Sequence, residues 1–187
     1  MVALSALLLP ILIAAVAVFF LSFLFHMVLR YHTTDFVKLS NEDAVMSSLR
    51  SFKIPPGDYM MPCGTGPESM KDPAFLEKFK QGPVVVMTVM PAGNMSMGKQ
   101  LVQWFIYCLV VSLIAGYIAA AALPAGSPYL AVFRFAGCTA FLCYAMAQFQ
   151  DSIWYKRKWT TTMKNVFDGL IYGLFTGGIF GAMWPKG

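Results

Sequence analysis

The sequence predicts an all-α membrane protein with four transmembrane helices and a small soluble α/β insert between helices 1 and 2. Composition is the first reason: 58% of the residues are hydrophobic, only 12% are charged, and the mean hydropathy is +0.62, whereas a soluble domain carries about 25% charged residues. The second reason is that four apolar windows approach the ~20 residues that cross a bilayer. The third is a polar stretch with turn and capping signals between the first two windows.

The first transmembrane helix is expected over residues 3–30. No Lys or Arg precedes its apolar run, and the run is about twice as long as the 7–15 residues of a signal-peptide core. We therefore expect a retained anchor, with a bend at Pro10, rather than a cleaved signal.

The soluble insert is expected over residues 31–98. Ser40 and Asp43 resemble a capping box, and Asp72, Pro73 and Gly82 have the N-cap, first-turn and stop positions of a second helix. The run VVVMTVM is apolar on both faces, which is typical of a covered strand. In order, we expect a strand over 34–39, a helix over 41–52, an extended segment or short strand over 58–62, a helix after Asp72 and a strand over 83–90. An insert this small buries too little surface to be stable alone, so we expect it to pack against the membrane domain or a partner.

The remaining helices are expected over 100–123, 128–150 and 165–184, with a basic interfacial loop over 151–164. This loop carries Lys156, Arg157 and Lys158, whereas the loop between helices 2 and 3 carries no charge. Loops rich in Lys and Arg stay on the cytoplasmic side of the membrane. We therefore expect a multi-pass protein of the cell inner membrane, with both termini outside and the insert in the cytoplasm.

A glycine ridge organises the fourth helix. Gly169, Gly173, Gly177 and Gly181 recur at intervals of four and share one face, where another helix can approach closely. The second helix offers a matching stripe of small residues, Ser112, Gly116 and Ala120, and the third offers Ala136, Gly137 and Ala140. We expect the ridge to pack within the chain, against the stripe of the second helix; docking on a partner helix is the alternative.

Polar residues near the inner ends of the helices are expected to form a polar cluster, namely His26, Gln103, Gln148 and Asp168. Ionisable groups are costly inside a membrane and often mark function there, so Asp168 with His26 could form a proton-sensitive site. The alternative is that these side chains reach water or headgroups at the interface. Lipid or partner contacts are expected from Arg134 and from the basic run of the loop with its two flanking tryptophans, namely Trp154, Lys156, Arg157, Lys158 and Trp159.

No recognisable catalytic or phosphate-binding motif occurs, and the four cysteines form neither a CxxC pair nor a disulfide framework. We expect no enzyme activity, no nucleic-acid partner and no cofactor. Copper is the alternative, because Met60, Met61 and Cys63 offer soft sulfur ligands that suit Cu(I). The competing interpretation is that methionine fills gaps in an apolar core.

These observations favour a non-catalytic accessory or assembly subunit that packs with the lipid bilayer and with other membrane subunits, or self-associates. The alternative is a small oligomeric channel or transporter for metal ions or protons, with Cu(I) handling through the insert. Between Leu109 and Leu123 the second helix carries only Ser112 and Tyr117 as polar residues, which disfavours a hydrophilic path through one monomer.

Overall fold

The computed structural model describes residues 2–94 and 96–187, and the chain is mostly helical. It divides into two compact units. The helical unit comprises Met1–Val37 and Ser96–Gly187, and the insert unit comprises Lys38–Met95. The insert was expected to begin at residue 31, but the seven residues 31–37 belong to the helical unit.

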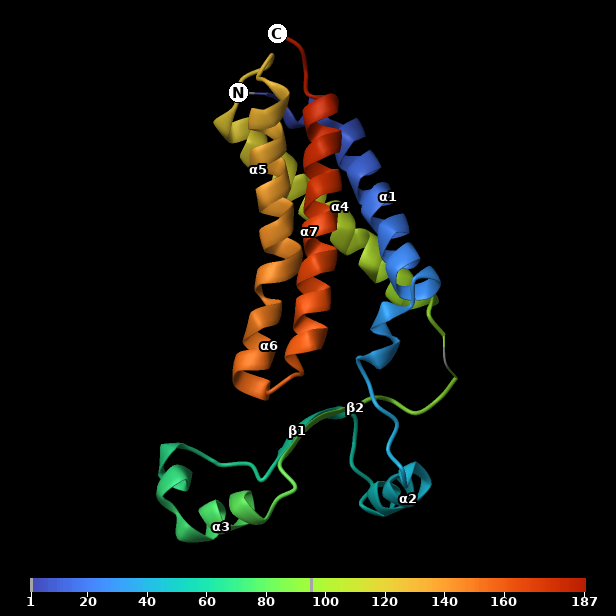
Figure 1. The fold of residues 1–187 in the computed structure, drawn as a ribbon, viewed down its shortest axis with the longest axis vertical. Helices are drawn as coiled ribbons and strands as arrows, with labels where there is room; N and C mark the ends of the chain where they lie inside the picture. Colours follow the sequence, from blue (N-terminus) through green and yellow to red (C-terminus); the bar gives the residue numbers. More distant parts are fainter. Residues whose placement is uncertain (1, 95) are drawn as a thin grey trace. The chain divides into compact units, whose positions relative to one another are not determined.

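The helical unit contains long helices interrupted by short irregular turns (Figure 1). A 3₁₀ turn over Leu4–Leu7 leads into α1 (Leu8–Phe23), and Pro10 lies in the first turn of α1, where a missing N–H is tolerated. The other elements are η2 (Leu24–Val28), η3 (Tyr31–Thr34), α4 (Gly98–Ala122), α5 (Tyr129–Phe141), η5 (Leu142–Met146), α6 (Gln148–Tyr155) and α7 (Trp159–Ala182). Of these, η2 and η5 are π-helical and η3 is a 3₁₀ helix.

Three continuous helical stretches are long and apolar enough to cross a membrane: Leu4–Val28, Gly98–Ala122 and Tyr129–Tyr155. The predicted fourth span corresponds to α7, which has 24 residues but is not among the three. Its four ridge glycines, its threonines and Asp168 lower its hydropathy.

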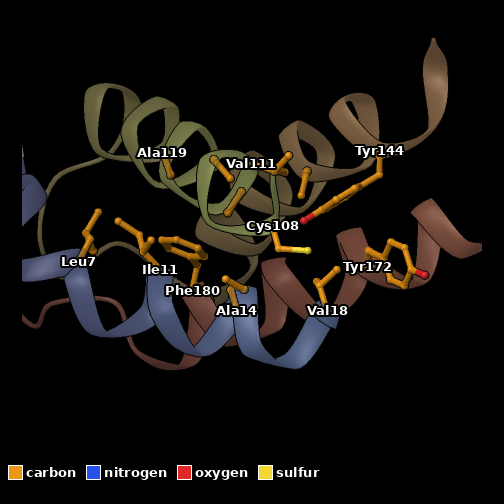
Figure 2. Packing of buried hydrophobic residues seen from close by; sticks show 14 of the residues in the cluster. Leu7, Ile11, Ala14, Val18, Cys108, Val111, Ala119, Tyr144, Tyr172 and Phe180 are labelled. Atoms are coloured by element: carbon orange, nitrogen blue, oxygen red, sulfur yellow. The ribbon is translucent and has the colours of Figure 1, made fainter. Parts of the chain in front are cut away.

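The four long helices pack in a ring. Helix α1 contacts α4 and α7, and α5 contacts the same two helices from the other side. Small side chains line the interior and let the helices approach closely; they include Ala14, Ala115 and Ala136, each fully buried. Larger residues such as Val18 and Phe180 fill the remaining core (Figure 2).

The glycine ridge packs within the chain, against α5 and η5. A Cβ added at Gly177 would lie 2.6 Å from the backbone oxygen of Phe133, and one at Gly173 would lie 2.9 Å from that of Gly137. A Cβ at Gly169 would meet Ala145 at 2.9 Å. These distances are below van der Waals contact, so the backbones of α5 and α7 touch because the ridge has no side chains.

The expected partner of the ridge, the small-residue stripe of α4, lies elsewhere. Ser112, Gly116 and Ala120 are all buried, but a Cβ added at Gly116 would meet the Phe180 ring at 2.9 Å and Ile11 at 3.5 Å. The stripe therefore makes room for an aromatic ring of α7 and for α1. Phe180 directly precedes the ridge glycine Gly181, and one residue along a helix turns the side-chain direction by about 100°, so the Phe180 ring points toward α4 while the ridge glycines face α5.

The basic loop is much shorter than the expected 151–164, because α6 runs to Tyr155 and α7 begins at Trp159. Lys156 takes a left-handed conformation (φ 57°) that ends α6. The backbone N–H groups of Lys156 and Arg157 both donate to the carbonyl of Asp151, and Arg157 Nη1 lies 3.3 Å from the Asp151 carboxylate. Ser152 and Thr162 share a buried hydrogen bond of 2.6 Å below the turn.

The insert unit holds α2 (Glu42–Ser51), α3 (Pro73–Gln81) and an antiparallel pair of strands, β1 (Gly57–Met61) and β2 (Val85–Val89). The register places Asp58 opposite Thr88, whose hydroxyl donates to the aspartate at 2.6 Å. Helix α3 begins as predicted: Asp72 accepts from the Ala74 N–H, Pro73 follows, and Gly82 (φ 61°) ends it.

Three local predictions for the insert are wrong. Residues 34–39 form no strand; Tyr31–Thr34 is a 3₁₀ helix instead. The N-cap of α2 is Asn41, without a side-chain cap hydrogen bond, so no capping box forms. Strand β2 is not covered on both faces, since its side chains alternate between half-buried and exposed. Among the described residues 38–94 none is buried, which shows that the insert has no core of its own.

Candidate functional site: a polar cluster beside an aromatic-lined cavity

A cavity of about 390 Å³ lies within the helical unit. Four aromatic side chains and five polar ones line it. The lining residues are Ser22, His26, Trp104, Tyr107, Tyr144, Gln148, Asn165, Asp168 and Tyr172. The volume is within the ~300–1,000 Å³ range of small-molecule sites, and an apolar wall with a few convergent polar groups is their usual character.

Two lining residues lie in π-helical turns. His26 is part of η2 and Tyr144 is part of η5. A π turn inserts an extra residue into a helix and often occurs at functional sites, because it changes the direction of the side chains that follow. Here the two π turns contribute one wall residue each, from α1 and from α5.

Asp168 is the acidic centre of the site and is only 4% exposed. Tyr31 donates its hydroxyl hydrogen bond to Asp168 Oδ1, while His32 Nε2 lies 3.0 Å from Asp168 Oδ2. Burial raises the pKa of Tyr31, and the hydrogen bond to Asp168 and the charge of that carboxylate raise it further. Tyr31 therefore stays protonated and remains a donor at physiological pH.

Asp35 is the second carboxylate of the cluster. Its Oδ2 lies 2.6 Å from His32 Nδ1, and its Oδ1 accepts from Lys164 Nζ at 2.8 Å. Lys164 also donates to the backbone oxygen of Tyr31 at 2.6 Å and to Thr34 Oγ1 at 2.8 Å. Burial alone would raise the pKa of Asp35, but the hydrogen bonds and charges of Lys164 and His32 outweigh it and lower that pKa. Asp35 is thus held as a carboxylate by its neighbours.

His26 completes the group. Its Nδ1 lies 3.0 Å from the backbone oxygen of Ser22, so Nδ1 carries the proton and donates. Its ring stacks on His32 with centroids 4.2 Å apart and planes 3° apart. His26, His32 and Asp168 each offer one potential ligand atom, and these atoms lie within 4.8 Å of one another.

Three polar atoms of the cavity wall are buried and have no hydrogen-bond partner among the described residues: Trp104 Nε1, Tyr144 OH and Tyr172 OH. Tyr144 and Tyr172 are 7% and 4% exposed. Figure 2 shows these two tyrosines on facing helices at one end of the buried core. A buried donor without a partner is costly, so the wall is suited to a polar occupant that would accept from these groups.

The structure brings three members of the predicted polar cluster together, since His26, Gln148 and Asp168 all line the cavity. Gln148 is bound there by Asn165, whose Nδ2 donates to its Oε1 at 3.3 Å. Gln103 is exposed and does not line the cavity. Its neighbour Trp104 does so instead, because one residue along a helix turns the side chain by about 100°.

The predicted lipid-contact and copper residues are not among the residues of this site. Trp154, Lys156, Lys158 and Trp159 are exposed around the short turn before α7, Arg157 is half-buried against Asp151, and Arg134 is exposed on α5. Met60 and Met61 are successive residues of β1 and each is more than 40% exposed. Side chains of successive strand residues point to opposite faces, so the intact strand cannot direct both thioethers, with Cys63, at one ion.

Sequence reasoning missed Tyr31, His32, Asp35 and Lys164. One signal was present: His32 and Asp35 are three residues apart, and positions i and i+3 are eclipsed in a 3₁₀ helix. The contacts of Tyr31 and His32 with Asp168 span more than 130 residues and had no local signal.

The chain matches no protein-family model, no curated protein and no solved structure. Its function is therefore argued from the geometry of the polar cluster and the cavity.

Proposed function

We propose that this protein is a non-catalytic, multi-pass membrane protein that binds a cation at the cluster of His26, His32 and Asp168 and acts as an accessory subunit in the membrane. The observation that carries the proposal is the convergence of two imidazoles and a buried carboxylate, two of which, His26 and Asp168, also line a cavity in the helical unit. Ionisable groups are expensive in such surroundings and are usually functional where they occur.

The charge of the cavity favours a cation. Asp168 is the only Asp, Glu, Lys or Arg among the lining residues of the described cavity. The neighbouring cation Lys164 is engaged by Asp35 and by two other oxygens, so it does not neutralise Asp168 directly. A positively charged ligand would meet the Asp168 carboxylate and His26 Nε2, and it would displace the proton between His32 Nε2 and Asp168 Oδ2.

Binding is better supported than conduction. Beyond the cavity, the interior of the unit is closed by fully buried small residues, by Phe180 and by the backbone contacts of the glycine ridge. Within the described residues, Ser112 and Thr176 are the buried polar side chains of that part, and neither forms a hydrogen bond. Two isolated hydroxyls do not make a hydrophilic path through a monomer.

We further propose that α7 is a fourth transmembrane span. At about 1.5 Å per residue its 24 residues extend about 36 Å, which exceeds the ~30 Å hydrocarbon core. Its polar residues Thr162, Asp168 and Thr176 are buried against the other helices rather than exposed. With four spans and a basic turn at Lys156–Lys158, the positive-inside rule places both termini outside the inner membrane and the insert in the cytoplasm.

The accessory role is supported by the insert unit. It has no buried residue among those described, yet exposes large apolar side chains such as Phe52, Met90 and Phe79. An apolar surface of this kind is typical of a segment that packs on another protein or on lipid. Other membrane subunits, or further copies of this chain, are the partners that a protein in the bilayer meets.

The proposal is tested with the purified full-length protein in detergent. Thermal unfolding is followed by tryptophan fluorescence without added cation and with Na⁺, Mg²⁺, Ca²⁺, Zn²⁺ or choline, for wild type, Asp168→Asn and the matched control Asp151→Asn. A cation at 100 times its dissociation constant stabilises the folded state by about 2.7 kcal/mol. At least one cation should raise the melting temperature of wild type and Asp151→Asn but not of Asp168→Asn. Equal responses in all three proteins, or none, would refute cation binding at this site.

A further inference from the structure

We infer that the cation is a first-row divalent transition metal of the zinc class, bound by His26 Nε2, His32 Nε2 and the carboxylate of Asp168. The inference rests on the proposed cation-binding function and specifies its ligand. The observation behind it is that the other polar atom of each of these side chains is already hydrogen-bonded: Nδ1 of both histidines and Oδ1 of Asp168 each have a partner.

Each histidine is oriented through its Nδ1. His26 Nδ1 is engaged by the Ser22 carbonyl and His32 Nδ1 by the Asp35 carboxylate, so Nε2 is the ring nitrogen that each histidine would offer to a metal. His32 Nε2 is hydrogen-bonded to Asp168 Oδ2, and a metal ion would take the place of the proton between these two atoms. Metal-binding histidines almost always donate their second ring nitrogen to a carbonyl or carboxylate, which fixes the tautomer and the ring orientation. Asp35 would have this orienting role, and Lys164 holds Asp35 in place.

The carboxylate of Asp168 is likewise oriented by a hydrogen bond to one of its two oxygens. Tyr31 donates to Oδ1, so Oδ2 is the oxygen that faces His32 Nε2, at 3.0 Å. Two ligands that each lie ~2.0–2.1 Å from a tetrahedral zinc are about 3.3 Å apart. Placing an ion between Asp168 and His32 therefore requires a movement of only a few tenths of an ångström.

His26 is the ligand that must move. Its ring is parallel to that of His32, and lone pairs of parallel rings do not converge on one point. His26 is exposed, whereas Asp168 is buried and His32 half-buried, so the ring of His26 can turn out of the stack about its side-chain torsions, and the Nδ1 hydrogen bond to Ser22 would be exchanged for the bond to the metal. The bound state would then have three protein ligands and one position left for water or another ligand from the cavity.

The ligand set selects the class of metal. Two imidazole nitrogens and one carboxylate suit Zn²⁺ and neighbouring first-row ions, whereas Mg²⁺ and Ca²⁺ require oxygen ligands and Cu(I) favours sulfur. Among the described residues, this is the one group of three or more His, Cys, Asp or Glu side chains close enough to hold an ion.

The test is zinc binding to the full-length protein in a background that carries both Cys63→Ser and Cys138→Ser, which removes the two exposed thiols among the described residues. Equilibrium dialysis should give one Zn²⁺ per chain. Affinity should fall at least tenfold in His26→Gln, His32→Gln and Asp168→Asn, and about 10–100-fold in Asp35→Asn, which removes only the orienting carboxylate. Asp151→Asn should bind as tightly as its background. Circular dichroism and gel filtration establish that each variant is folded.

The absorption spectrum of the Co²⁺-substituted protein provides a measurement that needs no variant. Tetrahedral cobalt with nitrogen and oxygen ligands is expected; a thiolate charge-transfer band would assign the metal to cysteine and overturn the inference. Zinc affinity unchanged in both histidine variants would overturn it as well. If Mg²⁺ or choline, and not Zn²⁺, stabilises the protein in an Asp168-dependent way, the inference fails while the proposed function stands. If no cation does so, both fail.

Discussion

The glycine ridge leads to a sharp test, because two neighbouring glycines of α7 differ in what a side chain would meet. A Cβ at Gly177 would lie 2.6 Å from Phe133 O and 3.0 Å from Gly137 Cα, both backbone atoms of α5. A Cβ at Gly178 would meet only the Tyr129 hydroxyl, at 3.5 Å, which is an ordinary contact. Gly177→Ala must therefore separate two helices, whereas Gly178→Ala need not move anything.

The magnitude follows from two opposing effects. Overpacking in a tight interior costs about 1–3 kcal/mol, and Ala in place of Gly stabilises a helix by about 0.5–1 kcal/mol. Gly177→Ala should then lose about 1–2 kcal/mol of unfolding free energy, which corresponds to a melting temperature lower by about 2–8 °C for a protein of this size. Gly178→Ala should be unchanged or more stable by up to about 1 kcal/mol.

Thermal unfolding of the two variants in the same detergent measures this difference, with gel filtration to report any change of association. If Gly177→Ala is as stable as Gly178→Ala, α5 and α7 do not touch through the ridge and the packing described here is wrong. If Gly177→Ala keeps its stability but a co-purifying subunit is lost, the ridge faces a partner instead.

Three further predictions concern the cluster and the topology. Lys164→Met removes the cation bound to Asp35, so it should lower unfolding free energy by about 1.5–3 kcal/mol, whereas Lys158→Met, which changes an exposed side chain, should leave it unchanged; equal effects in thermal unfolding would contradict the role of Lys164. Because the folded-state pKa of Asp35 is lowered, its contribution is present above the unfolded-state pKa of about 3.9 and is lost as pH falls through the folded-state pKa. Stability of wild type should therefore fall more steeply than that of Asp35→Asn below about pH 4, and parallel pH profiles would refute this. Cys63, which is exposed, should react with an impermeant thiol reagent only after cells are opened, with Cys63→Ser as the control; labelling in intact cells would reverse the proposed topology.

Local signals were sufficient for much of the fold. Apolar length predicted the stretches that become α1, α4 and α5–α6, and the Asp72–Pro73 start and Gly82 stop predicted α3, because these effects act within a few residues. The strand over 34–39 failed because Arg30 takes a left-handed conformation (φ 53°) after η2, and Tyr31–Thr34 then forms a 3₁₀ turn whose residues contact α7.

The candidate site was only partly predictable for the same reason. His26, Gln148 and Asp168 were recognised as polar residues at helix ends, but whether they face one another depends on helix rotation, which composition does not determine. The π turns at η2 and η5 add to that rotation. The partner of the ridge was likewise ambiguous, since both α4 and α5 carry small residues, and the position of Phe180 decides between them.

The central claim, that His26, His32 and Asp168 bind a metal cation, is tested most directly by X-ray absorption at the zinc edge of the loaded, full-length protein. The structure predicts a first coordination shell of nitrogen and oxygen at about 2.0–2.1 Å, with outer-shell scattering from two imidazole rings. A sulfur shell at about 2.3 Å, or a shell without imidazole, would contradict it.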